Sequence, residues 1–224
     1  MRLVPRDLEI IRWVARMKVA NAAQIGRAFG TTFFAMRQRC GLLIGAGLLR
    51  LEQPFHDQRA VYLATREGCG LAGCEFLPGQ DRVQIATLRH SLAVVSAALE
   101  LLLAAPGAVW VAEREVRADR LRGPEISNTH IPDGVLVLPD GSRTAVEVDL
   151  SAKAPARLAR IVSYYGRTRD YAAVRWFAAP PAMAARLQAL SRGLPHISVQ
   201  AWTVPAEAGG GVGGGGAWPG AARP

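Results

Sequence analysis

Apolar residues at helical spacing, followed by short apolar runs, divide the first third of the chain into regular elements. The helical spacing predicts helices over residues 6–17, 22–29 and 33–46. Asn21 can cap the second helix, Gly30 stops it, and Thr31 or Thr32 can cap the third. Strands are predicted over 47–51 and 60–63, with the polar loop 54–58 between them, and Thr65 caps a short fourth helix.

The rest of the chain alternates between apolar helical and strand patterns. In order, it predicts a helix over 85–104, a strand over 108–116, an arginine-rich polar loop over 119–130, a hairpin over 130–153, a helix over 154–170, a strand over 173–178, a helix over 182–192 and a strand over 197–204. The Pro78-Gly79 pair marks a linker over 76–82, and the glycine-rich tail 205–224 is expected to be disordered. Two folded domains are therefore expected, 1–75 and 83–204.

The hairpin over residues 130–153 is the most informative stretch. Two apolar runs flank residues 139–141, which read Pro-Asp-Gly. Proline suits the first position of a type I turn, and glycine accepts the left-handed conformation that closes it. A three-residue loop of this kind pairs Leu138 with Ser142. The turn therefore fixes the register of the whole hairpin.

Three carboxylates gather at the open end of this hairpin. Counting outward from the turn puts Asp133 opposite Glu147, with Cβ atoms about 5 Å apart, and Asp149 on the same face as Glu147. Carboxylates in mostly apolar strands repel one another, and a divalent cation such as Mg²⁺ would compensate them. The alternative is a solvated strand end whose acids pair with Arg143 or Arg157. Spacing alone leaves both interpretations open.

The net charge of the chain indicates the class of partner. The formal charge is +9 and the pI about 10.4, which favours nucleic acid or an anionic membrane surface. The three cysteines lack metal-binding spacing and fit a reducing compartment. No signal peptide opens the chain, and Glu100 interrupts the most apolar run, so a cytoplasmic protein without a membrane span is expected.

The first domain resembles the winged helix-turn-helix domains of bacterial DNA-binding proteins. The resemblance lies in three helices followed by a β-hairpin, and residues 1–80 carry a net charge of +5. It implies that the third helix enters the DNA major groove. Arg37, Gln38 and Arg39 on that helix, and Arg59 at the wing, are the candidate DNA contacts. The alternative for the helix arginines is an ordinary solvated surface.

The second domain resembles the restriction-endonuclease-like PD-(D/E)XK fold. The resemblance is carried by the predicted αβββαβ order, by Asp133 after a proline at the start of the second strand, and by Glu147-Val148-Asp149 in the third. The resemblances therefore imply an α/β (α+β) fold class, with a winged helix-turn-helix followed by a nuclease-like domain. The resemblance implies that Asp133 and Glu147 bind Mg²⁺, with the Val148 carbonyl as a candidate third ligand.

The sequence departs from that family at the position of its lysine. Asp149 stands where the family has a lysine two residues after the glutamate. Lys153, at the start of the next predicted helix, is the candidate replacement, because the fold tolerates such a migration. If the site is active, Asp149 or Lys153 positions the attacking water. The departure leaves catalysis open while it leaves the fold intact.

The helix predicted after the hairpin carries two stripes. One is apolar and should face the sheet: Leu158, Ile161, Val162 and Tyr165. The other is mostly basic: Lys153, Arg157, Arg160, Tyr164 and Arg167. Arg157, Arg160 and Arg167 are candidate phosphate contacts, which would make DNA binding salt-dependent. The alternative is a soluble surface helix in an arginine-rich chain.

The two halves together, over about residues 5–203, resemble the replication-relaxation family of plasmids and integrative elements. The resemblance implies DNA handling during replication or mobilisation, with a relaxase or replication initiator as a partner. The leading hypothesis is a DNA-binding protein with a Mg²⁺-dependent endonuclease domain. The alternative is a non-catalytic accessory factor or transcriptional regulator with a degenerate nuclease fold. A membrane-surface protein fits less well, since no basic amphipathic helix has an aromatic apolar face.

Overall fold

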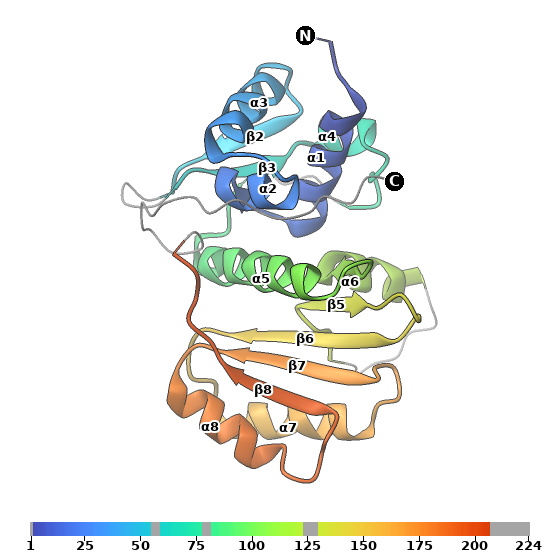
Figure 1. Ribbon diagram of the computed structural model, residues 1–224, viewed down its shortest axis with the longest axis vertical. Helices are drawn as coiled ribbons and strands as arrows, with labels where there is room; N and C mark the ends of the chain where they lie inside the picture. Colours follow the sequence, from blue (N-terminus) through green and yellow to red (C-terminus); the bar gives the residue numbers. More distant parts are fainter. Residues whose placement is uncertain (1, 55–58, 78–81, 123–129, 207–224) are drawn as a thin grey trace. The chain divides into compact units, whose positions relative to one another are not determined.

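The structure is a computed structural model that describes residues 2–54, 59–77, 82–122 and 130–206. The chain forms two compact units, the first built on Met1–Leu99 and the second on Glu100–Val204 (Figure 1). Helices and strands are mixed in both, which agrees with the α+β class expected from the sequence. The central parts of the predicted loop 54–58, linker 76–82 and loop 119–130, and the tail from residue 207, lie outside the described residues.

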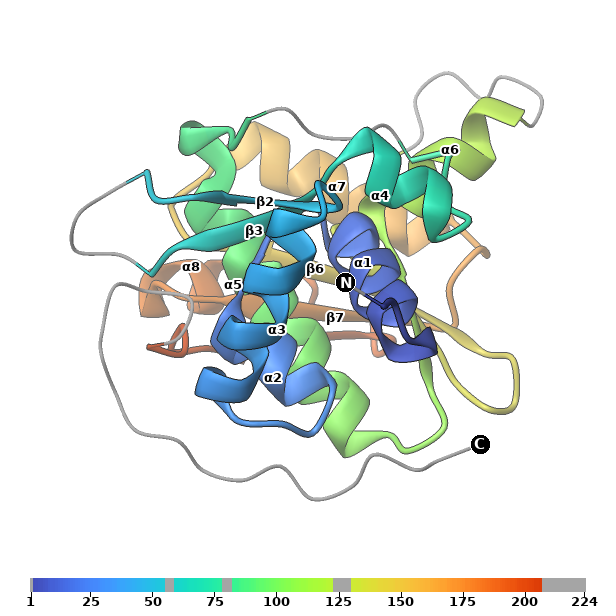
Figure 2. The same ribbon diagram turned by 90° about the horizontal axis from the view of Figure 1, so that it is seen from above.

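The first unit combines helices with a small antiparallel sheet. Helices α1, α2 and α3 lie side by side (Figures 1 and 2). Its elements are α1 (Pro5–Met17), β1 (Ala20–Asn21), α2 (Ala22–Ala28), α3 (Phe33–Gly45), β2 (Leu49–Glu52), β3 (Val61–Ala64) and α4 (Arg66–Leu71). The strand order is β1-β3-β2. Strand β1 was not predicted, because two residues are too short to carry a period of two.

The predicted caps of the first unit are present. The Asn21 side chain accepts a hydrogen bond from the Gln24 amide at 3.0 Å, and Thr32 accepts one from Ala35 at 3.2 Å. Thr65 accepts one from Gly68 at 3.0 Å. Each cap satisfies an amide that the first turn of a helix leaves without a partner, so the helix starts lie where the sequence indicated.

Helix α5 (Ile85–Ala104) is longer than its neighbours and spans the division between the units. Gln24 of α2 donates to the Leu92 carbonyl at 2.8 Å and to the Ser96 hydroxyl at 3.0 Å. These buried hydrogen bonds join the first part of α5 to the first unit. The contacts therefore divide the chain between Leu99 and Glu100, whereas the sequence suggested a linker over 76–82.

By length and composition, α5 is the one helix among the described residues that could cross a membrane. Half of its most apolar 18-residue window is buried inside the structure. Such burial is typical of a core helix, so the apolar composition of α5 is weak evidence for a membrane span.

The second unit is built on a five-stranded sheet of order β4-β5-β6-β7-β8. Its elements are β4 (Val109–Ala112), α6 (Glu113–Arg122), β5 (Gly134–Val137), β6 (Arg143–Asp149), α7 (Pro155–Arg167), β7 (Ala173–Ala178), α8 (Pro181–Leu190) and β8 (Ile197–Ala201). Strands β4, β5 and β6 are antiparallel, and β6, β7 and β8 are parallel. A core of apolar side chains from α6, α7 and α8 packs on one face of the sheet.

The prediction of a strand over 108–116 and a polar loop after it is wrong, because helix α6 occupies residues 113–122. The strand ends at Ala112, whose amide donates to the Glu115 side chain at 2.8 Å. Arg117 and Glu113 form an ion pair one helical turn apart at 2.6 Å. These local contacts start a helix in a charged segment, and apolar periodicity gives little signal there.

The β5–β6 hairpin has the register that its turn predicts. The Leu138 amide donates to the Ser142 carbonyl at 2.9 Å, and the Gly141 amide donates to the Leu138 carbonyl at 2.9 Å. Gly141 has a φ of +83°, the left-handed conformation that glycine accepts readily. Further along, Gly134 pairs with Val146. The turn and the pairing were therefore both predictable from local sequence.

Gly134→Ala should destabilise the second unit. A Cβ at this position would lie 1.9 Å from the Trp110 ring of β4, so the ring or the strand must move, at a cost of about 1–3 kcal/mol. Gly41→Ala is a matched control, because its Cβ meets nothing within 4 Å, and alanine should stabilise α3 by about 0.5–1 kcal/mol. Urea unfolding measures both. An unchanged midpoint for Gly134→Ala would contradict the Trp110 contact.

Candidate functional site

The acidic end of the hairpin forms the candidate active site of the second unit. Gly134 pairs with Val146, so the next pair outward is Asp133 and Glu147. Antiparallel pairs alternate, and counting from the hydrogen-bonded pair at the turn makes this a non-hydrogen-bonded pair, whose side chains lie closest. The charge of Asp133 contributes to raising the pKa of Glu147. The two carboxylates are therefore close enough to repel each other.

Beyond this pair the hairpin ladder cannot continue. The next hydrogen-bonded partners would be Pro132 and Val148, but proline has no N–H to donate. The Val148 amide donates instead to Asp133 Oδ2 at 2.8 Å. The Val148 carbonyl consequently receives no ladder hydrogen bond from Pro132, which fits its candidate role as a metal ligand.

Glu147 is buried, with 2% of its surface exposed. Its Oε1 accepts a hydrogen bond from the Tyr165 hydroxyl at 2.5 Å and lies 2.6 Å from His130 Nε2. Burial raises the pKa of Glu147, and Asp133 raises it further, while His130 and Tyr165 oppose the shift. The pKa of Tyr165 is raised by burial and by the Glu147 carboxylate, so its hydroxyl remains a donor.

Asp149 is also buried and has a different set of partners. Its Oδ2 accepts a hydrogen bond from the Trp176 indole at 2.9 Å, and its Oδ1 lies 2.5 Å from Lys153 Nζ. A buried carboxylate needs such partners to remain charged. Lys153 thus lies beside the acidic cluster, as the sequence suggested, and its direct partner is Asp149.

The side chains that contact the acidic cluster differ from those that the sequence suggests. The sequence offered Arg143 or Arg157 as partners for the acids. In the structure, the guanidinium of Arg143 lies over the Tyr171 ring at 5.8 Å, and Arg157 is exposed on α7. Lys153 and His130 contact the acids instead.

Sequence reasoning missed two side chains that hold the glutamate. Tyr165 was assigned to the apolar stripe of α7, and the structure confirms that Leu158, Ile161, Val162 and Tyr165 are buried. A tyrosine in an otherwise aliphatic stripe is the signal that a hydroxyl needs a buried partner. His130 lies a few residues before β5, and no sequence pattern links it to Glu147.

The donor set limits which metal ion the cluster can hold. Among the described residues, no group of three or more histidine, cysteine, aspartate or glutamate side chains is arranged for metal binding. Asp133 and Glu147 supply two carboxylates. That number suits Mg²⁺, which keeps several waters and takes the remaining oxygens from a substrate phosphate. The donors fit this ion better than zinc, which takes three or four protein ligands.

Helix α7 carries exposed cations outside this cluster. Arg157, Arg160 and Arg167 are exposed, and Lys153 precedes the helix. The burial of the opposite stripe confirms that α7 is amphipathic. The basic stripe is therefore accessible to a polyanion.

The candidate DNA contacts of the first unit divide into two groups. Arg37 and Gln38 are exposed on α3. Arg39 has an internal partner: its Nε lies 2.5 Å from Asp7 Oδ1, and its Nη2 contacts Asp7 Oδ2. The Arg59 guanidinium lies 5.2 Å from the ring centroid of Phe33, at the start of α3. The charge of Arg39 is therefore used inside the fold.

Asp7 connects α3 to the start of α1. It is fully buried, and its Oδ2 also accepts a hydrogen bond from the Val4 amide at 2.8 Å. Burial alone would raise the pKa of Asp7. The hydrogen bonds from Arg39 and Val4, together with the Arg39 charge, outweigh burial and lower the pKa below its ordinary value of 3.8. The ionised carboxylate therefore stabilises the folded unit.

Comparison of the chain with protein-family models, curated proteins and solved structures found no match.

Asp7→Asn should make the first unit less stable at neutral pH and less sensitive to acid. A lowered pKa means that the carboxylate contributes stability above the unfolded-state pKa, and that this contribution is lost as the pH falls through the folded-state pKa. The wild type should thus lose stability below about pH 4, while Asp7→Asn changes less. Thermal unfolding between pH 7 and pH 2 measures this. Glu9→Gln, exposed on the same helix, is the control. Equal acid sensitivity of Asp7→Asn and the wild type would exclude the ion pair.

Proposed function

We propose that the protein binds duplex DNA through its first unit and acts on DNA phosphodiesters with Mg²⁺ through its second unit. The observation that carries the proposal is the position of Asp133 and Glu147, one step beyond the Gly134–Val146 pair at the end of the β5–β6 hairpin. The second unit differs from the expected αβββαβ order in having helix α6 between its first two strands. The net charge of +9 fits a polyanionic partner.

The first unit supports a winged helix-turn-helix. Three helices precede the antiparallel strands β2 and β3, and β1 pairs with β3. In this arrangement α3 is the recognition helix, and its exposed face would enter the major groove. Arg37 and Gln38 lie on that face, and both side chains can reach base edges or phosphates. Arg39 is omitted from this interface because it holds Asp7.

The second unit supports a nuclease-like site. Asp133, Glu147 and the Val148 carbonyl would hold Mg²⁺, which supplies a Lewis acid and an activated water when bound. His130 and Tyr165 orient Glu147 by hydrogen bonds to a single oxygen, Oε1. Asp149 has both oxygens occupied by Trp176 and Lys153. Of the two residues that could orient the attacking water, Lys153 is therefore a better candidate than Asp149.

The basic stripe on α7 extends this interface. Arg157, Arg160 and Arg167 follow one exposed side of the helix that begins next to Lys153. Cations in a line can follow successive phosphates and release counterions. The stripe would hold the DNA backbone while the hairpin contacts a phosphodiester.

A second candidate function is that of a non-catalytic accessory factor or transcriptional regulator. The favouring observation is the aspartate at the position where nuclease-like domains have a lysine, together with its ion pair to Lys153. In this case the buried acids are structural. In either case, the resemblance in the sequence suggests replication or mobilisation of a plasmid or integrative element in the cytoplasm, with a relaxase or replication initiator as a partner.

Purified protein should nick supercoiled plasmid in the presence of Mg²⁺ or Mn²⁺, and Asp133→Asn or Glu147→Gln should reduce nicking to background. The reason is that each variant removes one of the two metal carboxylates. Agarose gel electrophoresis measures the nicked form. Asp140→Asn is the matched control, because this acid is exposed at the turn of the same hairpin. Absence of nicking by the wild type, with DNA binding retained, would favour the non-catalytic function.

Arg37→Ala combined with Gln38→Ala should weaken duplex binding, and the loss of one phosphate contact should reduce the salt slope by about 1. Gel shifts at several salt concentrations measure both quantities. Arg66→Ala is the control, since it removes an exposed arginine from α4 of the same unit. If the Arg37 and Gln38 variant binds like Arg66→Ala, the α3 interface is wrong.

A further inference from the structure

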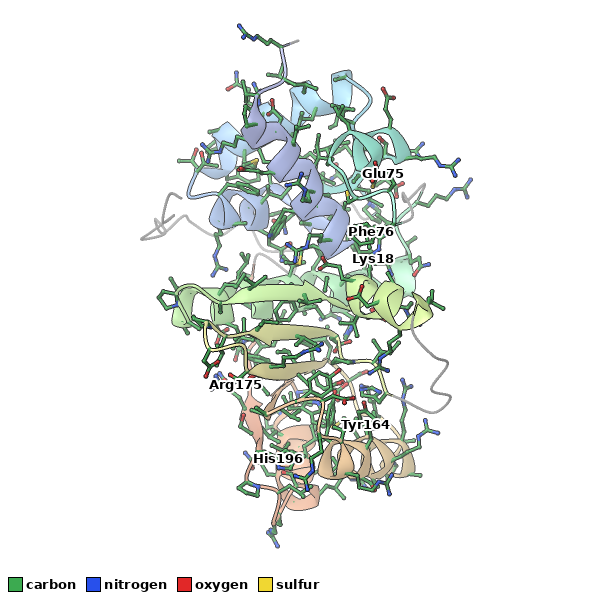
Figure 3. The ribbon with its side chains drawn as sticks, turned by 90° about the vertical axis from the view of Figure 1, so that its right-hand side faces the viewer. Lys18, Glu75, Phe76, Tyr164, Arg175 and His196 are labelled. Carbon is green, nitrogen blue, oxygen red and sulfur yellow. The ribbon has the colours of Figure 1, made fainter. Side chains whose placement is uncertain are left out.

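Nη1 of Arg120 on α6 and the hydroxyl of Tyr164 on α7 are buried polar atoms without a hydrogen-bond partner among the described residues. Figure 3 labels Tyr164 among the side chains between α7 and the sheet. Buried donors without partners are rare in native proteins, because burial removes the water that would satisfy them. Two such donors near one another indicate a ligand that supplies acceptors.

Both side chains belong to one cluster around Tyr171. Arg120 lies within hydrogen-bonding reach of the Tyr171 hydroxyl. The Tyr164 ring contacts the Tyr165 ring at a centroid distance of 5.3 Å, and the Tyr165 ring contacts that of Tyr171 at 6.1 Å. The Arg143 guanidinium lies over the Tyr171 ring at 5.8 Å. Two arginines and two tyrosine hydroxyls therefore converge on the same region.

His130 connects this cluster to the acidic hairpin. Its ring makes edge contacts with the rings of Tyr164 and Tyr165, with centroids 6.0 and 5.6 Å apart. One quarter of the His130 side chain is exposed, so the cluster has an accessible edge. His130 Nε2 also lies 2.6 Å from Glu147 Oε1. The cationic groups thus lie next to the candidate active site.

We propose that Arg120 and Tyr164 form a phosphate-binding site in the second unit, with Arg143 and His130 at its edge. A guanidinium has donors and no acceptor, so its ligand must supply oxygens, and phosphate accepts the paired donors of arginine especially well. The surrounding rings suit a nucleic-acid strand, because bases stack on aromatic side chains.

The phosphate of such a strand is either a terminal monoester or an internal diester. That the ligand is a nucleic-acid strand rests on the proposed function. The phosphate site itself requires only that phosphate binds, and no cleavage is needed. It would place one phosphate of the strand beside Asp133 and Glu147. Arg120 and Tyr164 would then bind that strand directly, through its phosphate.

The experiment measures phosphate binding in EDTA, where no metal-dependent cleavage occurs. The probes are inorganic phosphate and one short single-stranded oligonucleotide with and without a 5′-phosphate, measured by isothermal titration calorimetry. We expect the wild type to bind inorganic phosphate and at least one form of the oligonucleotide. Preference for the 5′-phosphorylated form assigns a terminal phosphate, and equal binding assigns an internal one.

Tyr164→Phe and Arg120→Met are the test variants, and Arg117→Met, exposed on the same helix, is the control. Tyr164→Phe should weaken phosphate binding about tenfold, because it removes one hydrogen bond to a charged group. Its melting temperature without phosphate should be equal to or above that of the wild type, since among residues 2–54, 59–77, 82–122 and 130–206 the hydroxyl has no hydrogen-bond partner to lose. A purely structural hydroxyl would give a lower melting temperature and unchanged binding.

Failure of this proposal differs from failure of the proposed function. Wild type that binds neither phosphate nor oligonucleotide, or Tyr164→Phe that binds both as the wild type does, overturns the phosphate site. Plasmid nicking and duplex gel shifts are separate measurements with separate variants. Phosphate binding that is lost in Arg120→Met, in a protein that nicks no plasmid, would support the site and reject the nuclease.

Discussion

Buried carboxylates in β6 are the constraint on which the second unit depends. Glu147 and Asp149 are each 2% exposed in a strand whose other central residues are apolar. Burial of a charge is unfavourable unless hydrogen bonds or opposite charges compensate it. The side chains that compensate come from four separate segments: His130 before β5, Lys153 before α7, Tyr165 of α7 and Trp176 of β7. The acids therefore help to set how the helix and strands pack together.

The first unit also contains a buried carboxylate that is compensated by a partner from another helix. Asp7 begins α1, is fully buried, and takes its counter-charge from Arg39 on α3. This ion pair joins the first helix to the helix with the exposed Arg37 and Gln38. One arginine of α3 thus fixes the helix, and its neighbours remain available to a partner. The separation suits the proposed DNA binding, because a binding surface must be held in place by contacts that its ligand does not use.

Local chemistry explains which parts of this structure could be predicted from sequence. The hairpin register follows from the turn at residues 139–141, and the limits of α5 and β7 follow from apolar patterns, so these agree with the structure. Helix α6 was missed because its charged sequence has little apolar periodicity. The partner of Arg39 was missed because Asp7 lies 32 residues away in the chain. Contacts between residues far apart in the chain form only when the chain folds, so a local sequence pattern does not reveal them.

The partners of the three acids separate a structural role from a chemical one. Asp149 has both oxygens engaged, by an indole and an ammonium group, so it resembles a closed structural ion pair. Glu147 differs, because Tyr165 and His130 both meet its Oε1 and neither uses its other oxygen. Hydrogen bonds that fix one oxygen of a carboxylate and leave the second to a ligand are the usual arrangement around metal-binding acids. The aspartate at position 149 is therefore compatible with the proposed metal site, since Glu147 is held through one oxygen and Lys153 places a positive charge beside Asp149.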